Sequence, residues 1–295
     1  MRIFVTGGTG FLGSHFIREA LARHHQVSAL CRVGSRPRIK LKYEPIWING
    51  GLDSDLRDAL AGADCLIHLA AAGVSPQKIN WADAIRWNVA GLDRLLDSAM
   101  AAGVRRIFVG GTGQEYGRAG DRFERIPSWA PLEPTGAYAT SKAAASILAG
   151  AKAREYGLEL AVLRPFHCFG EGQYEGNFWP ALKHAALAGA DFSMSPGEQV
   201  FDFCSAESVA SQFMDAIESL PLTPGTPIVK NIGSGQAMRL VEFAQMWWRI
   251  FAAKGRLNIG GLPYRPAEIM RLIPDLGAGC QMSSGEACAV FYEKK

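Results

Sequence analysis

The sequence has little net charge and no long apolar run. Its 31 Lys and Arg residues against 28 Asp and Glu residues give a formal charge of +3. No segment reaches the roughly eighteen apolar residues that a membrane helix needs, and the N-terminus lacks the features of a signal peptide. With neither a spanning segment nor a basic stripe, membrane and nucleic-acid partners are not expected. We expect a soluble cytoplasmic protein.

Cysteine is sparse and follows no pattern. The six cysteines form no C-x-x-C pair and lack the dense spacing of a secreted disulfide framework. Reduced thiols are therefore expected, and no metal site is predicted. The 48% hydrophobic and 20% charged fractions are those of an ordinary globular enzyme, which argues against a disordered chain. The length suits one large α/β domain, alone or with a small cap.

Short apolar runs alternate with longer segments of helical period, as in repeated βαβ units. Strands are expected at Ile3–Thr6, Val27–Leu30, Cys65–Leu69, Ile107–Gly110 and Leu160–Arg164, with a weaker one at Ile46–Ile48. Helices are expected at Gly13–Ala22, Asp55–Leu60, Trp81–Ala102, Ala137–Tyr156, Phe178–Ala188, Glu207–Ser219 and Leu240–Ala253. The pattern predicts a Rossmann fold with a doubly wound parallel sheet in residues 1–165. A smaller, interleaved substrate-binding region follows in residues 166–295, with some segments returning to the Rossmann domain.

A glycine-rich turn joins the first predicted strand to the first helix. Residues 6–13 read Thr-Gly-Gly-Thr-Gly-Phe-Leu-Gly. In this setting Gly7 permits a sharp turn, Gly10 lets a pyrophosphate approach the backbone, and Gly13 lets helix and strand pack closely. The helix N-terminus offers free N–H groups and a positive dipole end to phosphates. The turn therefore predicts a dinucleotide site.

Tyr138 and Lys142 are four residues apart, so on a helix they share one face. A fixed cation about 5 Å from a phenol favours the phenolate, so we expect Lys142 to lower the pKa of Tyr138. Such a tyrosine acts as an acid in reduction or as a base in oxidation.

The glycine turn closely resembles that of the extended short-chain dehydrogenases/reductases, the NAD-dependent epimerase/dehydratase family. Further likeness lies in His68–Ala71, in Asn88, and in the segments Gly110–Gly117 and Glu133–Tyr138. The resemblance runs from residue 1 to about residue 275 and implies that Thr112 completes a catalytic Thr–Tyr–Lys group. It implies cofactor contacts from Gly7, Thr9, Gly10, Phe11, Leu12, Gly13, Leu52, Leu69, Ala70, Ala71, Asn88, Tyr138, Lys142, Pro165 and His167.

The end of the second predicted strand carries no acidic residue of the kind that binds the ribose hydroxyls of NAD. Arg32 follows that strand and Arg36 comes shortly after, and arginine suits a 2′-phosphate. NADP(H) is therefore preferred as the cofactor, with NAD(H) as the alternative. A second interpretation is that these basic residues form a solvated loop that contacts nothing.

The predicted substrate side departs from the family pattern at two positions. His167 stands where the stretch R-P-x-N-V-x-G carries Asn, and Phe201 replaces the diphosphate-binding Arg of G-x-Q-x-R-D-F. Asn177 matches an Asn that meets the nucleotide diphosphate, and Arg265 matches another Arg-bearing segment. The resemblance thus implies a nucleotide-sugar substrate, contacted by Thr112, Gly113, Gln114, Tyr138, His167, Asn177 and Arg265.

Sugar dehydratases of the family carry Asp-Glu after the catalytic Thr, whereas Gly113-Gln114 stand here. We therefore expect an NADPH-dependent reductase of a nucleotide-linked keto-deoxysugar, acting at C4. The first alternative is an NAD-dependent nucleotide-sugar 4-epimerase, and the second is a non-catalytic dinucleotide-sensing protein. The family commonly dimerises through two helices, here Trp81–Ala102 and Ala137–Tyr156, so a homodimer is expected.

Overall fold

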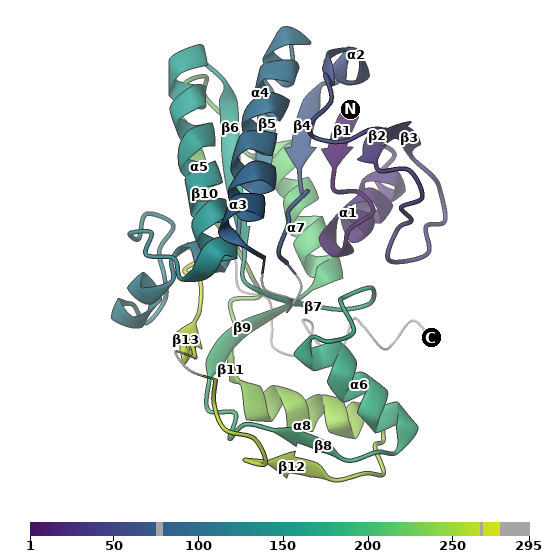
Figure 1. The fold of residues 1–295 in the computed structure, drawn as a ribbon, viewed down its shortest axis with the longest axis vertical. Coiled ribbons are helices and arrows are strands. Elements are labelled where there is room, and N and C mark those ends of the chain that lie inside the picture. The colour runs from purple at the N-terminus through teal and green to yellow at the C-terminus, as the bar shows by residue number, and fades with distance from the viewer. Residues whose placement is uncertain (75–78, 266–267, 278–295) are drawn as a thin grey trace.

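The computed structural model describes residues 1–74, 79–265 and 268–277. They form a large sheet covered by helices and a smaller lobe next to the carboxyl ends of the strands (Figure 1). The parts of the predicted substrate-binding region at 266–267 and 278–295 lie outside the described residues. Within the described residues, no helix combines the length and the apolarity that crossing a membrane requires.

The central sheet is parallel and has seven strands in the order β10-β6-β5-β4-β1-β2-β3. This order confirms the predicted Rossmann-type fold. All six predicted strands are present, and β10 is a seventh that the sequence analysis did not name. Their bounds are β1 Arg2–Thr6, β2 Gln26–Cys31, β3 Ile46–Asn49, β4 Cys65–His68, β5 Arg106–Gly110, β6 Glu159–Pro165 and β10 Ile228–Ile232. The chain order reverses between β1 and β4, and ligands of open α/β sheets bind outside that point.

Helices cover both faces of the sheet, as the alternation of buried side chains within β1 requires. Ile3 and Val5 pack on one face against α1 (Phe11–Ala22) and α7 (Ala206–Ser219). Phe4 packs on the other face, where α4 (Gly91–Ala101) and α5 (Gly136–Tyr156) lie. Side chains alternate between faces along a strand, so both faces of β1 are apolar and covered.

The predicted helix Trp81–Ala102 is interrupted by a π-helical segment. It consists of α3 (Trp81–Ala84), the π segment η1 (Ile85–Ala90) and α4 (Gly91–Ala101). The predicted helix Ala137–Tyr156 is α5, Gly136–Tyr156, and it ends at Gly157, whose φ of 65° is the left-handed conformation that terminates helices. The predicted helix Asp55–Leu60 is shorter in the structure, where α2 spans Arg57–Leu60.

The smaller lobe has an aromatic core. The helices α6 (Phe178–Ala188) and α8 (Leu240–Ile250) confirm two predicted helices and enclose Trp179, Phe243 and Trp247. A four-stranded sheet connects the lobe to the main sheet, and a two-stranded sheet lies at its far end. The strands are β7 His167–Phe169, β8 Phe192–Met194, β9 Val200–Ser205, β11 Ala237–Arg239, β12 Leu257–Ile259 and β13 Arg271–Leu272.

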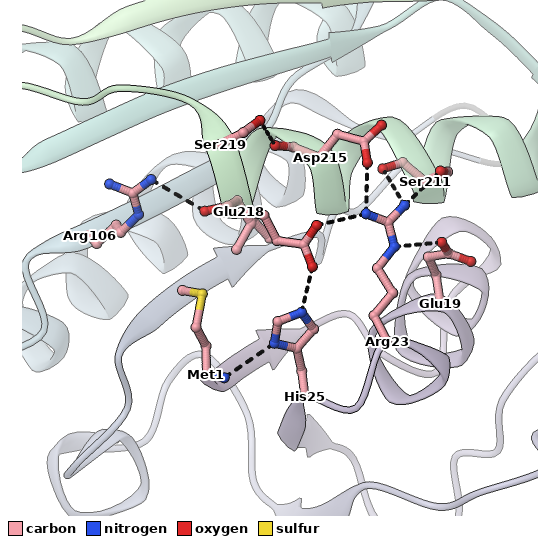
Figure 2. A network of polar contacts seen from close by, with 10 residues as sticks. Met1, Glu19, Arg23, His25, Arg106, Ser211, Asp215, Glu218 and Ser219 are labelled. Atoms are coloured by element: carbon pink, nitrogen blue, oxygen red, sulfur yellow. Dashed lines mark hydrogen bonds and ion pairs between the residues drawn. The ribbon is translucent and has the colours of Figure 1, made fainter.

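A polar network fastens the end of α1 to α7, close to Met1 at the start of β1 (Figure 2). The Arg23 guanidinium donates to Asp215 Oδ1 at 2.7 Å and to Glu218 Oε2 at 2.8 Å. His25 Nε2 lies 2.8 Å from Glu218 Oε1 on its other side. Because α7 comes from the C-terminal half of the chain, these contacts fix a late segment against the first βαβ unit.

Candidate active site

The glycine turn is packed too tightly for side chains. Gly7 has a φ of +76°, and a Cβ there would lie 2.4 Å from the amide nitrogen of Ala70. A Cβ on Gly13 would lie 2.0 Å from the carbonyl oxygen of Gly7, whereas at Gly10 the nearest atom, the same oxygen, would be 3.1 Å away. The turn therefore lies directly against the loop after β4, as a pyrophosphate cradle requires.

The rest of the turn is held in place by Ser14. Its hydroxyl donates to the Gly10 carbonyl oxygen at 2.6 Å and accepts from the Arg38 amide at 3.0 Å. The loop after β2 is thereby tied to the first turn of α1. Four residues of the turn that are predicted to contact the cofactor are half-buried: Thr9, Gly10, Phe11 and Leu12.

Asn88 connects the loop after β4 to α5. Its side chain accepts from the Ala72 amide at 2.7 Å and donates to the Ala72 carbonyl at 3.0 Å and to Ser141 Oγ at 2.9 Å. Ser141 in turn donates to the Tyr138 carbonyl at 2.8 Å. Asn88 lies in the π segment η1, and such segments often occur at functional sites. It therefore orients the helix that carries Tyr138, and the predicted cofactor residues Leu69, Ala70 and Ala71 adjoin the loop that it holds.

The three predicted catalytic residues come together near the carboxyl end of β5. Thr112 follows β5 and caps the short 3₁₀ helix η2 (Gly113–Glu115), while Tyr138 and Lys142 lie on α5. The side chains of Tyr138 and Thr112 lie near each other, since Thr112 acts on the pKa of Tyr138. Lys142 is buried, and its Nζ donates to the Gly110 carbonyl at 2.6 Å.

The expected lowering of the Tyr138 pKa by Lys142 is wrong for this structure. Burial raises the pKa of Tyr138 above its ordinary value of 10.0, and the Glu115 carboxylate raises it further, whereas Thr112 lowers it. Burial also lowers the pKa of Lys142, with the Glu115 charge opposing. Tyr138 and Lys142 do lie on one helix, as their spacing predicted. However, the Lys142 ammonium donates to the Gly110 carbonyl, and the Glu115 carboxylate, which lies outside the motif, acts on the Tyr138 phenol.

That carboxylate belongs to a buried ion pair behind the site. Glu115 Oε2 lies 2.8 Å from Arg164 Nε, and neither side chain is more than 4% exposed. The same oxygen accepts from Ser146 Oγ at 2.8 Å, and Oε1 accepts from the Thr112 amide at 2.9 Å. This role of Glu115 was not predicted from the sequence, where the available signal was an acidic residue inside the glycine-rich segment after a buried strand.

His68 ends β4 beside this group and carries no charge at neutral pH. Burial, followed by the charge of Lys142, lowers the pKa of His68 to about 3. Its Nδ1 lies 2.7 Å from Thr6 Oγ1, in the strand that leads into the glycine turn. His68 therefore links two neighbouring strand ends without adding to the local charge.

On the adenosine side the two predicted arginines follow β2 at the surface. Arg32 and Arg36 are both exposed, and a tight turn joins them, since the Ser35 amide donates to the Arg32 carbonyl at 2.9 Å. Leu52, the other residue predicted there, packs against Gly91 of α4 and accepts from Arg94 Nε at 3.2 Å through its carbonyl. A role for any of the three in holding the cofactor stays a prediction.

Two of the predicted substrate residues, His167 and Gly113, lie against aromatic rings. His167 begins β7, just after Pro165 at the end of β6, and its ring stacks on Phe201 with centroids 4.2 Å apart and planes 11° apart. Although His167 is exposed as a residue, the atoms packed around its imidazole desolvate the ring and lower the pKa of His167 to about 4, so the ring is neutral at pH 7. Gly113 gives the space that the Phe166 ring needs, since a Cβ there would lie 3.0 Å from it.

The remaining substrate residues lie on the lobe and beside η2. Asn177 precedes α6 and is half-buried, and Gln114 is exposed next to the catalytic Thr112. Arg265 is exposed, in a segment whose Tyr264 hydroxyl accepts from the Glu198 amide at 3.2 Å. That bond places the segment beside the loop that leads into β9, the strand of Phe201.

Residues 3–233 match the sequence model of the NAD dependent epimerase/dehydratase family. A putative dihydroflavonol 4-reductase of Synechocystis sp. is 39% identical over 143 residues, which cover 47% of this chain and 41% of that protein. The chain spans less than two thirds of the length of several curated relatives that it matches.

Two solved structures show how far the fold is shared. The UDP-N-acetylglucosamine 4-epimerase from Methanobrevibacter ruminantium superimposes with a TM-score of 0.84 at 22% identity, over 94% of this chain and 89% of that one. MoeE5, in complex with UDP-glucose and NAD, has a TM-score of 0.81 at 27% identity, over 98% of this chain and 96% of its own. The likeness therefore extends through the smaller lobe.

The buried ion pair gives a prediction about stability. Replacing Glu115 with Gln leaves the Arg164 charge buried without its partner, so we expect a loss of about 3–5 kcal/mol in the free energy of unfolding. The double variant Glu115→Gln/Arg164→Met removes both charges and should recover part of that loss. Urea unfolding followed by circular dichroism measures both. An unchanged urea midpoint for Glu115→Gln would show that the buried Arg164 charge does not depend on the Glu115 carboxylate for stability.

Proposed function

This chain belongs to the NAD-dependent epimerase/dehydratase family, and we propose that it is a reductase that uses NADPH to reduce a keto group, at C4, of a nucleotide-linked keto-deoxysugar. The observation that carries the proposal is the meeting of Thr112, Tyr138 and Lys142 beside the glycine turn. A dinucleotide fits this place because the turn leaves no room for a Cβ at Gly7 or Gly13. When bound, the nicotinamide supplies the hydride.

Each catalytic side chain has a distinct task in this proposal. Tyr138 donates a proton to the alkoxide oxygen that forms as the carbonyl is reduced. Its raised pKa suits that direction, because the phenol keeps its proton at neutral pH. Thr112 hydrogen-bonds the carbonyl oxygen and sets its position. Lys142, fixed by its bond to the Gly110 carbonyl, is placed to hold the nicotinamide ribose.

The residues after Thr112 favour reduction over elimination of water. A dehydratase needs an acid and a base beside the sugar, and Gly113 and Gln114 supply neither. Glu115 does not replace them, because its carboxylate is buried in bonds to Arg164, Ser146 and the Thr112 amide. The carboxylate nearest to the site is thus committed to structure.

The nucleotide-linked substrate is supported by likeness to MoeE5, whose complex contains UDP-glucose. Asn177 at the start of α6 and Arg265 are the proposed contacts to its phosphates. Arginine supplies charge and a forked donor pair, and the first turn of a helix supplies free amides. Together with Gln114 and His167 they line the proposed sugar side.

A 4-epimerase is the second candidate, because the solved structures that share the fold include UDP-sugar 4-epimerases. Such an enzyme removes a hydride and returns it to the opposite face, so it keeps its dinucleotide. The reductase is expected to oxidise one NADPH for each sugar reduced. A protein that purifies with bound NAD and interconverts epimers without added cofactor would favour the epimerase.

We also propose a homodimer formed through α3, η1, α4 and α5. Trp81 and Ile85 are exposed on the first two segments, and Ile147 is exposed on α5. The contacts of α5 with α3 and η1 place these elements side by side. Large apolar side chains gathered on adjoining helices fit a two-fold interface.

Tyr138→Phe tests the proton donor. We expect kcat for ketosugar reduction to fall by about 10²–10⁴ while the affinity for NADPH is retained, because only the proton donor is lost. Wild-type kcat should stay flat from neutral pH until it falls above pH 10, since an acid of raised pKa keeps its proton longer. Nicotinamide absorbance measures the rate. The control is Tyr156→Phe, an exposed tyrosine on the same helix. Full biological activity in Tyr138→Phe would favour the dinucleotide sensor.

Arg32→Ala tests the cofactor preference. Loss of a charge-assisted bond to the 2′-phosphate should raise KM for NADPH by roughly 10- to 100-fold and leave KM for NADH little changed. Lys42→Ala, at the far end of the same basic run, is the matched control. If neither Arg32→Ala nor Arg36→Ala alters the ratio of kcat/KM between the two cofactors, the basic residues contact no phosphate.

Ile147→Glu tests the proposed dimer. A charge in an apolar interface is costly to bury, so this variant should be monomeric at concentrations where the parent protein is dimeric. Size-exclusion chromatography with light scattering gives the mass. Leu187→Glu, an equally exposed leucine on α6 in the smaller lobe, is the control. A dimer that survives Ile147→Glu unchanged would place the interface elsewhere.

A further inference from the structure

The substrate side contains a neutral aromatic stack at the two positions where the sequence departs from the family pattern. Phe201 lies under the His167 ring, and Phe203 meets the same ring edge-on with centroids 5.3 Å apart. The two departures are therefore one structural unit. The His167 ring, which replaces the family's Asn side chain, stacks on the Phe201 ring, which replaces the family's Arg side chain.

One side of this stack is anchored and the other is accessible. Phe201 is 5% exposed and packs in a cluster with Tyr116 and Phe166, directly behind the catalytic segment. His167 is exposed, and its ring makes no hydrogen bond to any residue that the structure describes. A flat ring with a free polar edge is thus presented at the start of β7, one residue from Phe166.

The arginines on the strands paired with β9 make other bonds, since Arg239 pairs with Glu198 and Glu242 and Arg271 donates to the Glu124 carbonyl. Asp202, next to Phe201, is fully buried and accepts from the Ser234 and Gly235 amides at 2.7 Å each. The Arg164 guanidinium is committed to Glu115, and Lys142 to the Gly110 carbonyl. The neutral imidazole supplies no positive charge in compensation.

We propose that the His167–Phe201 stack is the specificity-determining element of the substrate side and that it receives an uncharged ring of the substrate instead of its diphosphate. The face of the substrate ring gains contact area and dispersion energy when it packs on the His167–Phe201 stack. The imidazole edge offers one hydrogen bond to a hydroxyl of that ring. The inference rests on the proposed carbonyl reduction at Tyr138. It leaves the phosphates of a nucleotide-linked substrate to other residues.

The first experiment separates the ring from the hydrogen bond. KM is measured with saturating NADPH for dTDP-4-keto-6-deoxyglucose and for the phosphate-free methyl 4-keto-6-deoxyglucoside. His167→Asn restores the family residue but removes the ring, so KM should rise about three- to tenfold for both ketones. His167→Phe keeps the ring and should raise KM less. His24→Asn, the same change at an exposed site whose φ of 63° suits Asn, is the control.

The second experiment restores the charge. With Phe201→Arg, KM for the dTDP ketone should fall and become more dependent on salt between roughly 0.01 and 0.15 M, while KM for the methyl glycoside should not improve. Wild-type KM for the dTDP ketone should depend less on salt than that of the variant. Because Phe201 is buried, circular dichroism must show that the variant folds; His167→Asn tests the proposal independently if it does not.

The inference is overturned if His167→Asn binds both ketones as well as the parent protein does, or if a folded Phe201→Arg variant changes neither KM nor its salt dependence. If the wild-type protein reduces no ketone, it is the proposed function that fails. The stack is then judged by calorimetry with UDP, which a folded Phe201→Arg variant should bind at least about tenfold more tightly than the parent. Equal UDP binding would reject the stack as well.

Discussion

The arrangement of the candidate site depends on the buried ion pair between Glu115 and Arg164. Glu115 follows β5, Arg164 lies in β6, and Ser146 of α5 bonds the same carboxylate. Three elements that each contribute to the site are therefore held by one group. Desolvated charges of opposite sign tolerate little displacement, because each loses water that only its partner replaces. The pair thus fixes Thr112, the helix of Tyr138 and the strand that leads to His167 relative to one another.

The same group explains why the chemistry of Tyr138 could not be derived from helical spacing. Spacing brings a lysine near a phenol, but the pKa of the phenol follows from everything that surrounds it. Here burial and a carboxylate from another element outweigh the cation, which donates to the Gly110 carbonyl. Hydrogen bonds join Glu115 to Ser146 and Arg164, which are too far apart in the sequence for helix or strand periodicity to predict the contact.

The sheet was predictable because its strands are short apolar runs between clear helical periods. The strand β10 was not named, since Lys230 and Asn231 interrupt its apolar pattern at an edge of the sheet. The π segment around Asn88 also escaped prediction, because it differs from a helix by hydrogen bonding and not by composition. On the substrate side the sequence showed which residues had changed, whereas only coordinates show that His167 and Phe201 stack on each other.

The path of the chain between sheet and lobe has a bearing on how this fold diversifies. After β6 the chain enters β7 and the lobe, returns through α7 and β10 to the main sheet, and then leaves again for β11 and α8. The lobe is therefore no contiguous cassette that recombination could exchange in a single piece. A change at the stack therefore involves two strands, β7 and β9, which pair in space although α6 and β8 lie between them in the chain.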